Sequence, residues 1–195
     1  MQHVFSKNSV IQATVALALG YLLLLPGPVL SAAAPVIASP QQNKDPLNEQ
    51  EADQIAEARD QPVVRIKLYQ KFIEQRIAVI KELGPNPKAE DRKEQLRARL
   101  EEFTRLSDEL QDNLDTFDDA HADIRKALKE LVPACAKWPD ILKQATDDPA
   151  YDFPRKTALD AAESTSDEAK KLLESQTKYF AEHKDEAGKN GTGPG

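Results

Sequence analysis

Carboxylate side chains gather in one segment of the chain, and this segment is the best candidate for chemistry. The range Asp108–Asp123 holds seven Asp and Glu residues and no Lys or Arg. Within it, Asp112, Asp115 and Asp119 recur at a spacing that places them on one face of a helix. Oxygen ligands of this kind suit hard divalent cations, and His121 adds an imidazole, a common metal ligand. The segment is therefore a candidate site for a divalent cation or a small ligand.

Two other interpretations of this acidic stripe remain open. Neighbouring lysines and arginines could neutralise it, in which case it is a solvated helix face. It could also attract a basic partner protein electrostatically. The pair Asp118-x-x-His121 matches half of a di-iron site, but such a site needs two pairs, and His183 has no carboxylate three residues before it. A dinuclear metal site is not predicted, and His121 is expected to fix helix register or to reach solvent.

The single cysteine, Cys135, could serve as a reactive thiol or form an intermolecular disulfide. The alternative is a small buried side chain. The sequence has no second cysteine for an internal disulfide, no haem-attachment or redox Cys pair, and no Gly-rich phosphate loop. No cofactor is therefore expected. Three aromatic residues between prolines, Trp138, Tyr151 and Phe153, could line a pocket or plug one end of the fold.

The acidic stripe and His121 belong to a stretch, Lys88–Val132, that contains neither Gly nor Pro. Core positions of an unbroken heptad pattern follow it at alternating spacings of four and three, as in a coiled coil. These positions are Leu96, Leu100, Phe103, Ser107, Leu110, Leu114, Phe117, His121, Ile124, Leu128 and Leu131. The pattern predicts one long helix of about 45 residues, which would be about 67 Å long at about 1.5 Å per residue.

Other segments also have helical patterns, and none alternates like a strand. Helices are predicted from Asp45-Pro46 to about Arg59, from Pro62 to Leu83, in a short piece from Trp138, and from about Phe153 to His183. The Gly-Pro-Asn-Pro link after Leu83 makes its two flanking helices antiparallel neighbours. The sequence thus predicts an all-α fold, an elongated antiparallel helical bundle, in a single domain at 46–184.

The first 38 residues have the layout of a secretory signal peptide: Lys7, then an apolar block, then small residues. Cleavage is expected before Ala34 or before Ser39, and an uncleaved anchor is the alternative. Residues 39–45 have the composition of a linker. Residues 185–195 are Gly-rich and polar, and are predicted to be a disordered tail. An exported protein, periplasmic or secreted, is the expectation.

The charge balance narrows the classes of partner. The chain has 26 Lys and Arg against 33 Asp and Glu, a net charge of −7. This excess of acid argues against nucleic acid, and no membrane insertion is expected after signal cleavage. The leading hypothesis is a non-enzymatic protein of the cell envelope, structural, adaptor or chaperone-like, that contacts a protein partner or another copy of itself. The alternative is the divalent-cation or small-ligand site described above; an enzyme is the third hypothesis, because no acid–base or nucleophile motif occurs.

Overall fold

A computed structural model describes residues 45–188, which all belong to one compact unit. Helices and short connections make up this range, with no strand among them, so the prediction of an all-α fold is confirmed. The predicted signal peptide and nearly all of the predicted linker lie outside the described residues. The six helices are α1 (Glu49–Glu57), α2 (Pro62–Leu83), α3 (Arg92–Asp119), α4 (Arg125–Cys135), α5 (Trp138–Leu142) and α6 (Asp152–Glu182).

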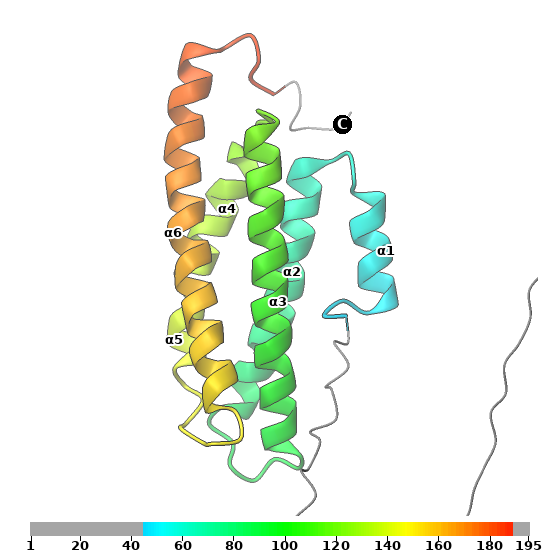
Figure 1. Ribbon diagram of the computed structural model, residues 1–195, viewed down its shortest axis with the longest axis vertical. Coiled ribbons are helices and arrows are strands. Elements are labelled where there is room, and N and C mark those ends of the chain that lie inside the picture. The colour runs from blue at the N-terminus through cyan, green and yellow to red at the C-terminus, as the bar shows by residue number, and fades with distance from the viewer. Residues whose placement is uncertain (1–44, 189–195) are drawn as a thin grey trace, which may run out of the picture. The chain divides into compact units, whose positions relative to one another are not determined.

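The helices surround the core as a ring with four sides, formed by α2, α3, α6 and the pair α4 and α5 (Figure 1). Helix α2 packs along α3, and α3 packs along α6. The short helices α4 and α5 follow one another and close the ring, because both pack against α2 and against α6. Helix α1 lies outside this ring and packs on α2.

The prediction of one helix of about 45 residues is wrong. Helix α3 ends at Asp119, after 28 residues, and α4 begins at Arg125. His121 adopts the left-handed conformation, with φ of 52°. Its N–H donates to the Asp118 carbonyl at 2.8 Å, and the Ala122 N–H donates to the Phe117 carbonyl at 2.9 Å. These two bonds form a Schellman motif, which normally has Gly at the left-handed position.

Other boundaries differ from the prediction for local reasons. Helix α1 is capped by Asn48 rather than Asp45: the Asn48 side chain accepts from the Glu51 N–H at 2.9 Å, and the Glu51 carboxylate accepts from the Asn48 N–H at 3.0 Å. This capping box satisfies two amides that would otherwise lack partners. Helix α4 contains Pro133 in its interior. Helix α6 runs without a break from Asp152 to Glu182, close to the predicted bounds.

The seam between α2 and α3 is built from large apolar side chains. Ile66, Ile73 and Ile80 of α2 are fully buried, as are Leu100 and Leu110 of α3. Burying each such side chain contributes about 1.5–3 kcal/mol. The two helices joined by the Gly-Pro-Asn-Pro link therefore each contribute large apolar side chains to the core of the ring.

A buried ion pair attaches α1 to this seam. The guanidinium of Arg76, on α2, donates to the Glu51 carboxylate at 2.5 and 2.7 Å, to the Pro46 carbonyl at 2.6 Å and to Glu102, on α3, at 3.1 Å. Burial disfavours the Glu51 carboxylate, but the hydrogen bonds and charge of Arg76 outweigh this effect and lower the pKa of Glu51. Three segments that are separate in sequence are thus joined by one guanidinium.

Candidate functional site

The acidic stripe lies on the exposed side of α3 and meets α6. Asp112, Asp115 and Asp119 are all exposed. None of them takes part in an ion pair with a Lys, Arg or His within residues 45–188. Glu168 of α6 comes close to two of them, which sequence reasoning did not anticipate. We call Asp112, Asp115, Asp119 and Glu168 the acidic face.

Glu168 is the most perturbed carboxyl of this face. Burial raises its pKa to about 7, assisted by the negative charges of Asp115 and Asp112 and opposed by Lys171. Its Oε1 atom is shielded from solvent and has no hydrogen-bond partner among the described residues. At neutral pH, therefore, Glu168 holds a proton for part of the time.

The candidate metal ligands do not converge. Within residues 45–188, no three His, Cys, Asp or Glu side chains form a group that could hold a metal ion. Asp112 and Asp115 face Glu168 along the middle of the seam between α3 and α6. Asp119 is the last residue of α3, and His121 lies beyond it in the left-handed turn.

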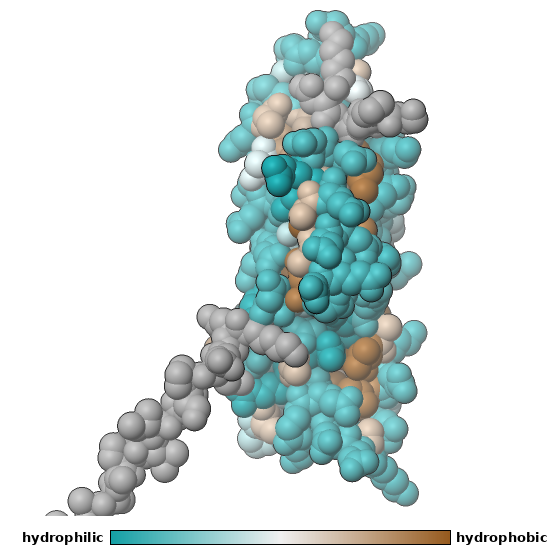
Figure 2. All heavy atoms as spheres, turned by 90° about the vertical axis from the view of Figure 1, so that its right-hand side faces the viewer, coloured by the Kyte–Doolittle hydropathy of each residue, from teal (hydrophilic) through white to brown (hydrophobic). Residues whose placement is uncertain are grey.

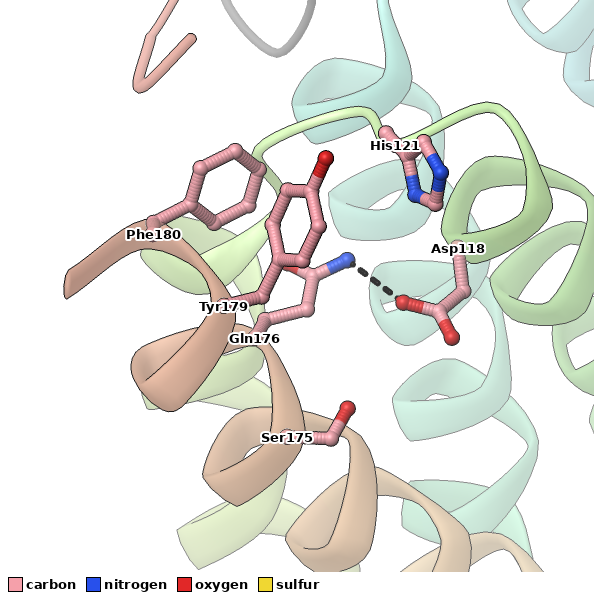
Figure 3. A pocket seen from close by; sticks show the side chains of 6 residues that line it. All are labelled: Asp118, His121, Ser175, Gln176, Tyr179 and Phe180. Carbon is pink, nitrogen blue, oxygen red and sulfur yellow. Dashed lines mark hydrogen bonds between the residues drawn. The ribbon is translucent and has the colours of Figure 1, made fainter. Parts of the chain in front are cut away.

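His121 instead contributes to a small open cavity at the end of α3 (Figure 3). The cavity has a volume of about 240 Å³ and is lined by Asp118, His121, Ser175, Gln176, Tyr179 and Phe180. Two of these side chains come from the end of α3 and the turn that follows it, and four come from α6. The carboxylate, imidazole and hydroxyl groups give this cavity the polar partners that a small ligand needs.

Both histidines of the described residues stack on one tyrosine. The ring of His121 lies 4.9 Å from that of Tyr179, at an angle of 19°, and His183 lies 4.2 Å from it, at 16°. The Tyr179 hydroxyl donates to Glu186 at 2.8 Å, and this bond raises the pKa of Tyr179. The spacing of Tyr179 and His183, one helical turn apart, was a usable sequence signal; their approach to His121 was not.

Gln176 holds the turn after α3 in place. Its amide nitrogen donates to Asp118 and to the Ala122 carbonyl, both at 3.1 Å, and its amide oxygen accepts from the Ile124 N–H at 3.2 Å. Gln176 is itself buried. A buried amide that satisfies three partners fixes their geometry, so the backbone from Asp118 to Ile124 is positioned by α6.

The last described residues reach the same region. Residues 185–188, part of the predicted disordered tail, form a turn. The Gly188 N–H donates to Asp123 at 3.0 Å. Asp123 also accepts two hydrogen bonds from the Arg125 guanidinium, at 2.8 and 2.7 Å, and these bonds lower the pKa of Asp123.

Cys135 lies in the core, at the end of α4. Its side chain is fully buried and forms no disulfide. Burial raises the pKa of the thiol to about 12, so the nucleophilic thiolate is scarce at neutral pH. This position favours the interpretation of a small buried side chain over a reactive thiol.

The aromatic residues near the prolines divide into two groups. Trp138 and Tyr151 are buried, and Trp138 packs edge-on against Phe103 with ring centroids 5.6 Å apart. They fill one end of the core. Phe153 is 79% exposed and takes no part in this packing.

Comparison with known proteins identifies no relative. No protein-family model matches the sequence, and neither a curated protein nor a solved structure is significantly similar to it. Among residues 45–188, no helix is both long enough and apolar enough to cross a membrane.

Proposed function

We propose that this protein acts without catalysis, as a helical-bundle protein that contacts a basic partner protein through the acidic face. The observation that carries the proposal is the geometry of the acidic face: its three aspartates are exposed, none of them forms an ion pair within residues 45–188, and Glu168 approaches two of them. The like charges of Asp115 and Asp112 add to the effect of burial on the pKa of Glu168. Lys or Arg side chains of a partner would relieve this repulsion. Charge complementarity of this kind speeds association and selects partners.

Few large hydrophobic side chains of the described residues are exposed, which is consistent with an electrostatic contact. Val64, at 43%, and Phe153 are the large hydrophobic side chains that the described residues expose most. The face over which α1 lies is mainly hydrophilic, and its apolar residues form separate small patches (Figure 2). Scattered apolar residues do not form an apolar docking surface.

We place this contact in the cell envelope because residues 1–38 have the pattern of an export signal. A structural, adaptor or chaperone-like role fits a surface that binds without a catalytic group. Self-association would need a basic region on a second copy of the chain, and the same experiment can detect it.

The test begins with cross-linking of the tagged protein in its native envelope and identification of the captured protein. Binding of that purified protein is then measured for the wild type and for the triple variant Asp112→Asn, Asp115→Asn, Asp119→Asn. A control variant, Glu49→Gln, Asp53→Asn, Glu57→Gln, changes three exposed carboxylates of α1 by the same total charge.

We expect the α3 variant to bind at least about tenfold more weakly, while the α1 variant keeps most of the affinity. Wild-type affinity should also fall as salt screens the contact. Equal affinities for the two variants and the wild type would refute the proposal.

A second function, binding of a small ligand, is favoured by the cavity beside His121. Calorimetry with Ca²⁺, Zn²⁺ and Fe²⁺, on the wild type and on the triple α3 variant, tests the cation form of this hypothesis. Heat that is absent, or equal for both proteins, removes the acidic face as a cation site. A His121→Gln variant extends the same test to the cavity.

A further inference from the structure

The contact between α3 and α6 differs in kind from the contact between α2 and α3. The buried positions of α6 are mostly small or polar rather than large and apolar. They are Ala158, Ala161, Ala162, Thr165, Ser166, Ala169, Leu172, Gln176 and Phe180. Small side chains remove less apolar area from water than Ile or Leu, so apolar burial holds α6 less strongly than it holds α2.

Hydrogen bonds between polar side chains replace part of this burial. The Gln111 amide donates to the Thr165 hydroxyl at 3.0 Å, and the Ser164 hydroxyl donates to Gln111 at 2.9 Å. One helical turn earlier in α3, the Ser107 hydroxyl is fully buried and has no hydrogen-bond partner among the described residues. A polar seam with an unsatisfied group costs less to open than an apolar one, since water satisfies the exposed groups.

Glu168 is half-buried and lies at this seam, near the middle of α6. From α3, Asp115 and Asp112 face it; from its own helix, Lys171 acts in the opposite sense. Helix α4 also packs on α6, but it brings its Arg125 over the ring of Phe180, three turns further along. On that side, the charge of Lys170 acts on Cys135 instead. The charges that act on Glu168 are therefore mainly the two aspartates of α3.

We propose that α6 is the separable helix of this bundle, and that it docks more tightly on α3 when Glu168 holds a proton. A protonated Glu168 adds no charge to the seam and can donate its O–H to a neighbouring carboxylate. An ionised Glu168 places a third negative charge beside Asp112 and Asp115. This proton-dependent docking of α6 involves only residues of the chain itself and does not depend on the proposed partner.

The direction of the pH effect follows from the environment of Glu168 in docked and in separated α6. In separated α6, water surrounds the carboxyl and the aspartates no longer act on it, so it ionises at its ordinary pKa, near 4.5. In docked α6, the pKa of Glu168 is higher, about 7. Between these values the docked state binds the proton more tightly, and a rise in pH through this range therefore favours separation.

Hydrogen exchange of the full chain, followed by mass spectrometry at pH 5.5 and pH 8, tests the proposal. The amides of α2 in the same sample serve as reference, so the intrinsic effect of pH on exchange cancels. Glu168→Gln is the test variant, because its amide keeps the shape but cannot ionise. Glu163→Gln, an exposed position on the same helix, is the control, and Asp115→Asn removes the facing charge.

We expect the protection of α6, relative to α2, to fall about fivefold from pH 5.5 to pH 8, because solvent screening of a half-buried carboxyl reduces the effect of the full difference between about 4.5 and about 7. Glu163→Gln should keep this fall, Glu168→Gln should abolish it, and Asp115→Asn should reduce it. Equal protection of α6 and α2 at both pH values would overturn the claim that α6 separates. An unchanged fall in Glu168→Gln would overturn the role of this carboxyl.

Discussion

Replacing Glu51 with Gln tests whether the buried ion pair holds α1 on the bundle. The change keeps the size of the side chain and removes its charge. Arg76 then loses the stronger of its two carboxylate partners, although Glu102 still accepts from it at 3.1 Å. The side chains of Arg76 and Glu51 are only 8% and 7% exposed, so water can replace little of the lost interaction.

Breaking a buried pair by removing one partner costs about 3–5 kcal/mol. Here the remaining carboxylate, and one hydrogen bond to the Gln side chain, offset part of the loss. We therefore expect Glu51→Gln to lower the free energy of unfolding by about 1.5–3 kcal/mol. For a unit of this size, the Tm should fall by about 4–10 °C.

Urea unfolding followed by circular dichroism measures the loss. A double-mutant cycle with Arg76→Met separates the pair interaction from other effects, and should give a coupling of about 1–3 kcal/mol. Glu57→Gln, an exposed change on the same helix, is the matched control and should stay within about 0.5 kcal/mol of the wild type. A Glu51→Gln variant as stable as this control, or strictly additive single changes, would show that the pair does not hold α1.

Four further predictions concern single side chains. Because the pKa of Glu168 is raised in the fold, the stabilising effect of its proton is complete below the unfolded pKa near 4.5 and is lost as the pH rises through about 7. Allowing for screening by solvent, urea unfolding should show that the free energy of unfolding falls by about 1 kcal/mol from pH 5 to pH 8. The Glu168→Gln variant should lack this fall. His121→Gly should give a protein about 1 kcal/mol more stable than His121→Ala in thermal unfolding, since only Gly adopts positive φ without strain; equal stability would contradict the left-handed turn. Gln176→Leu should cost about 1–3 kcal/mol, because the buried Ile124 N–H loses its acceptor; calorimetric unfolding measures it, and a neutral result would mean that this amide finds water. Cys135 should react with a thiol reagent far more slowly in the native protein than in denaturant, and similar rates would show that the core opens readily around it.

Helix positions followed from the sequence wherever local signals agreed with the packing. Pro62 at a helix start and Gly84 after a helix end bound α2 at the predicted residues. The heptad positions from Leu96 to Leu114 are buried as predicted. These assignments depend on the spacing of apolar residues and on residues with special backbone geometry, and both can be read directly from the sequence.

The turn after α3 could not be predicted in this way. No Gly marks it, and the heptad pattern continues through Ile124 and Leu128. Gln176, which is distant in the sequence, supplies the hydrogen bonds that hold the turn. A contact of this kind adds to local preference and can override it, so His121 appeared to be one more residue in a continuous helix.

The same limit applied to the acidic face. The spacing of Asp112 and Asp115 identified a charged helix face, but Glu168 is more than 50 positions away. Its position against α3 depends on how α6 packs, and the buried positions of α6 include small residues such as Ala161 and Ala169, whose neighbours cannot be read from one chain segment. Composition predicted the excess of acid; only the packing of two helices showed where the carboxylates repel one another.

The contact between Trp138 and Phe103 has a practical consequence. The chain has a single tryptophan, and it is buried at the start of α5 with its ring edge-on to α3. Its fluorescence therefore reports the environment of one place inside the ring of helices. Helix α1 packs on α2 alone, so its release would reduce helicity and leave the emission unchanged. Recorded together, emission and circular dichroism would distinguish fraying at the periphery from opening of the core, without an added label.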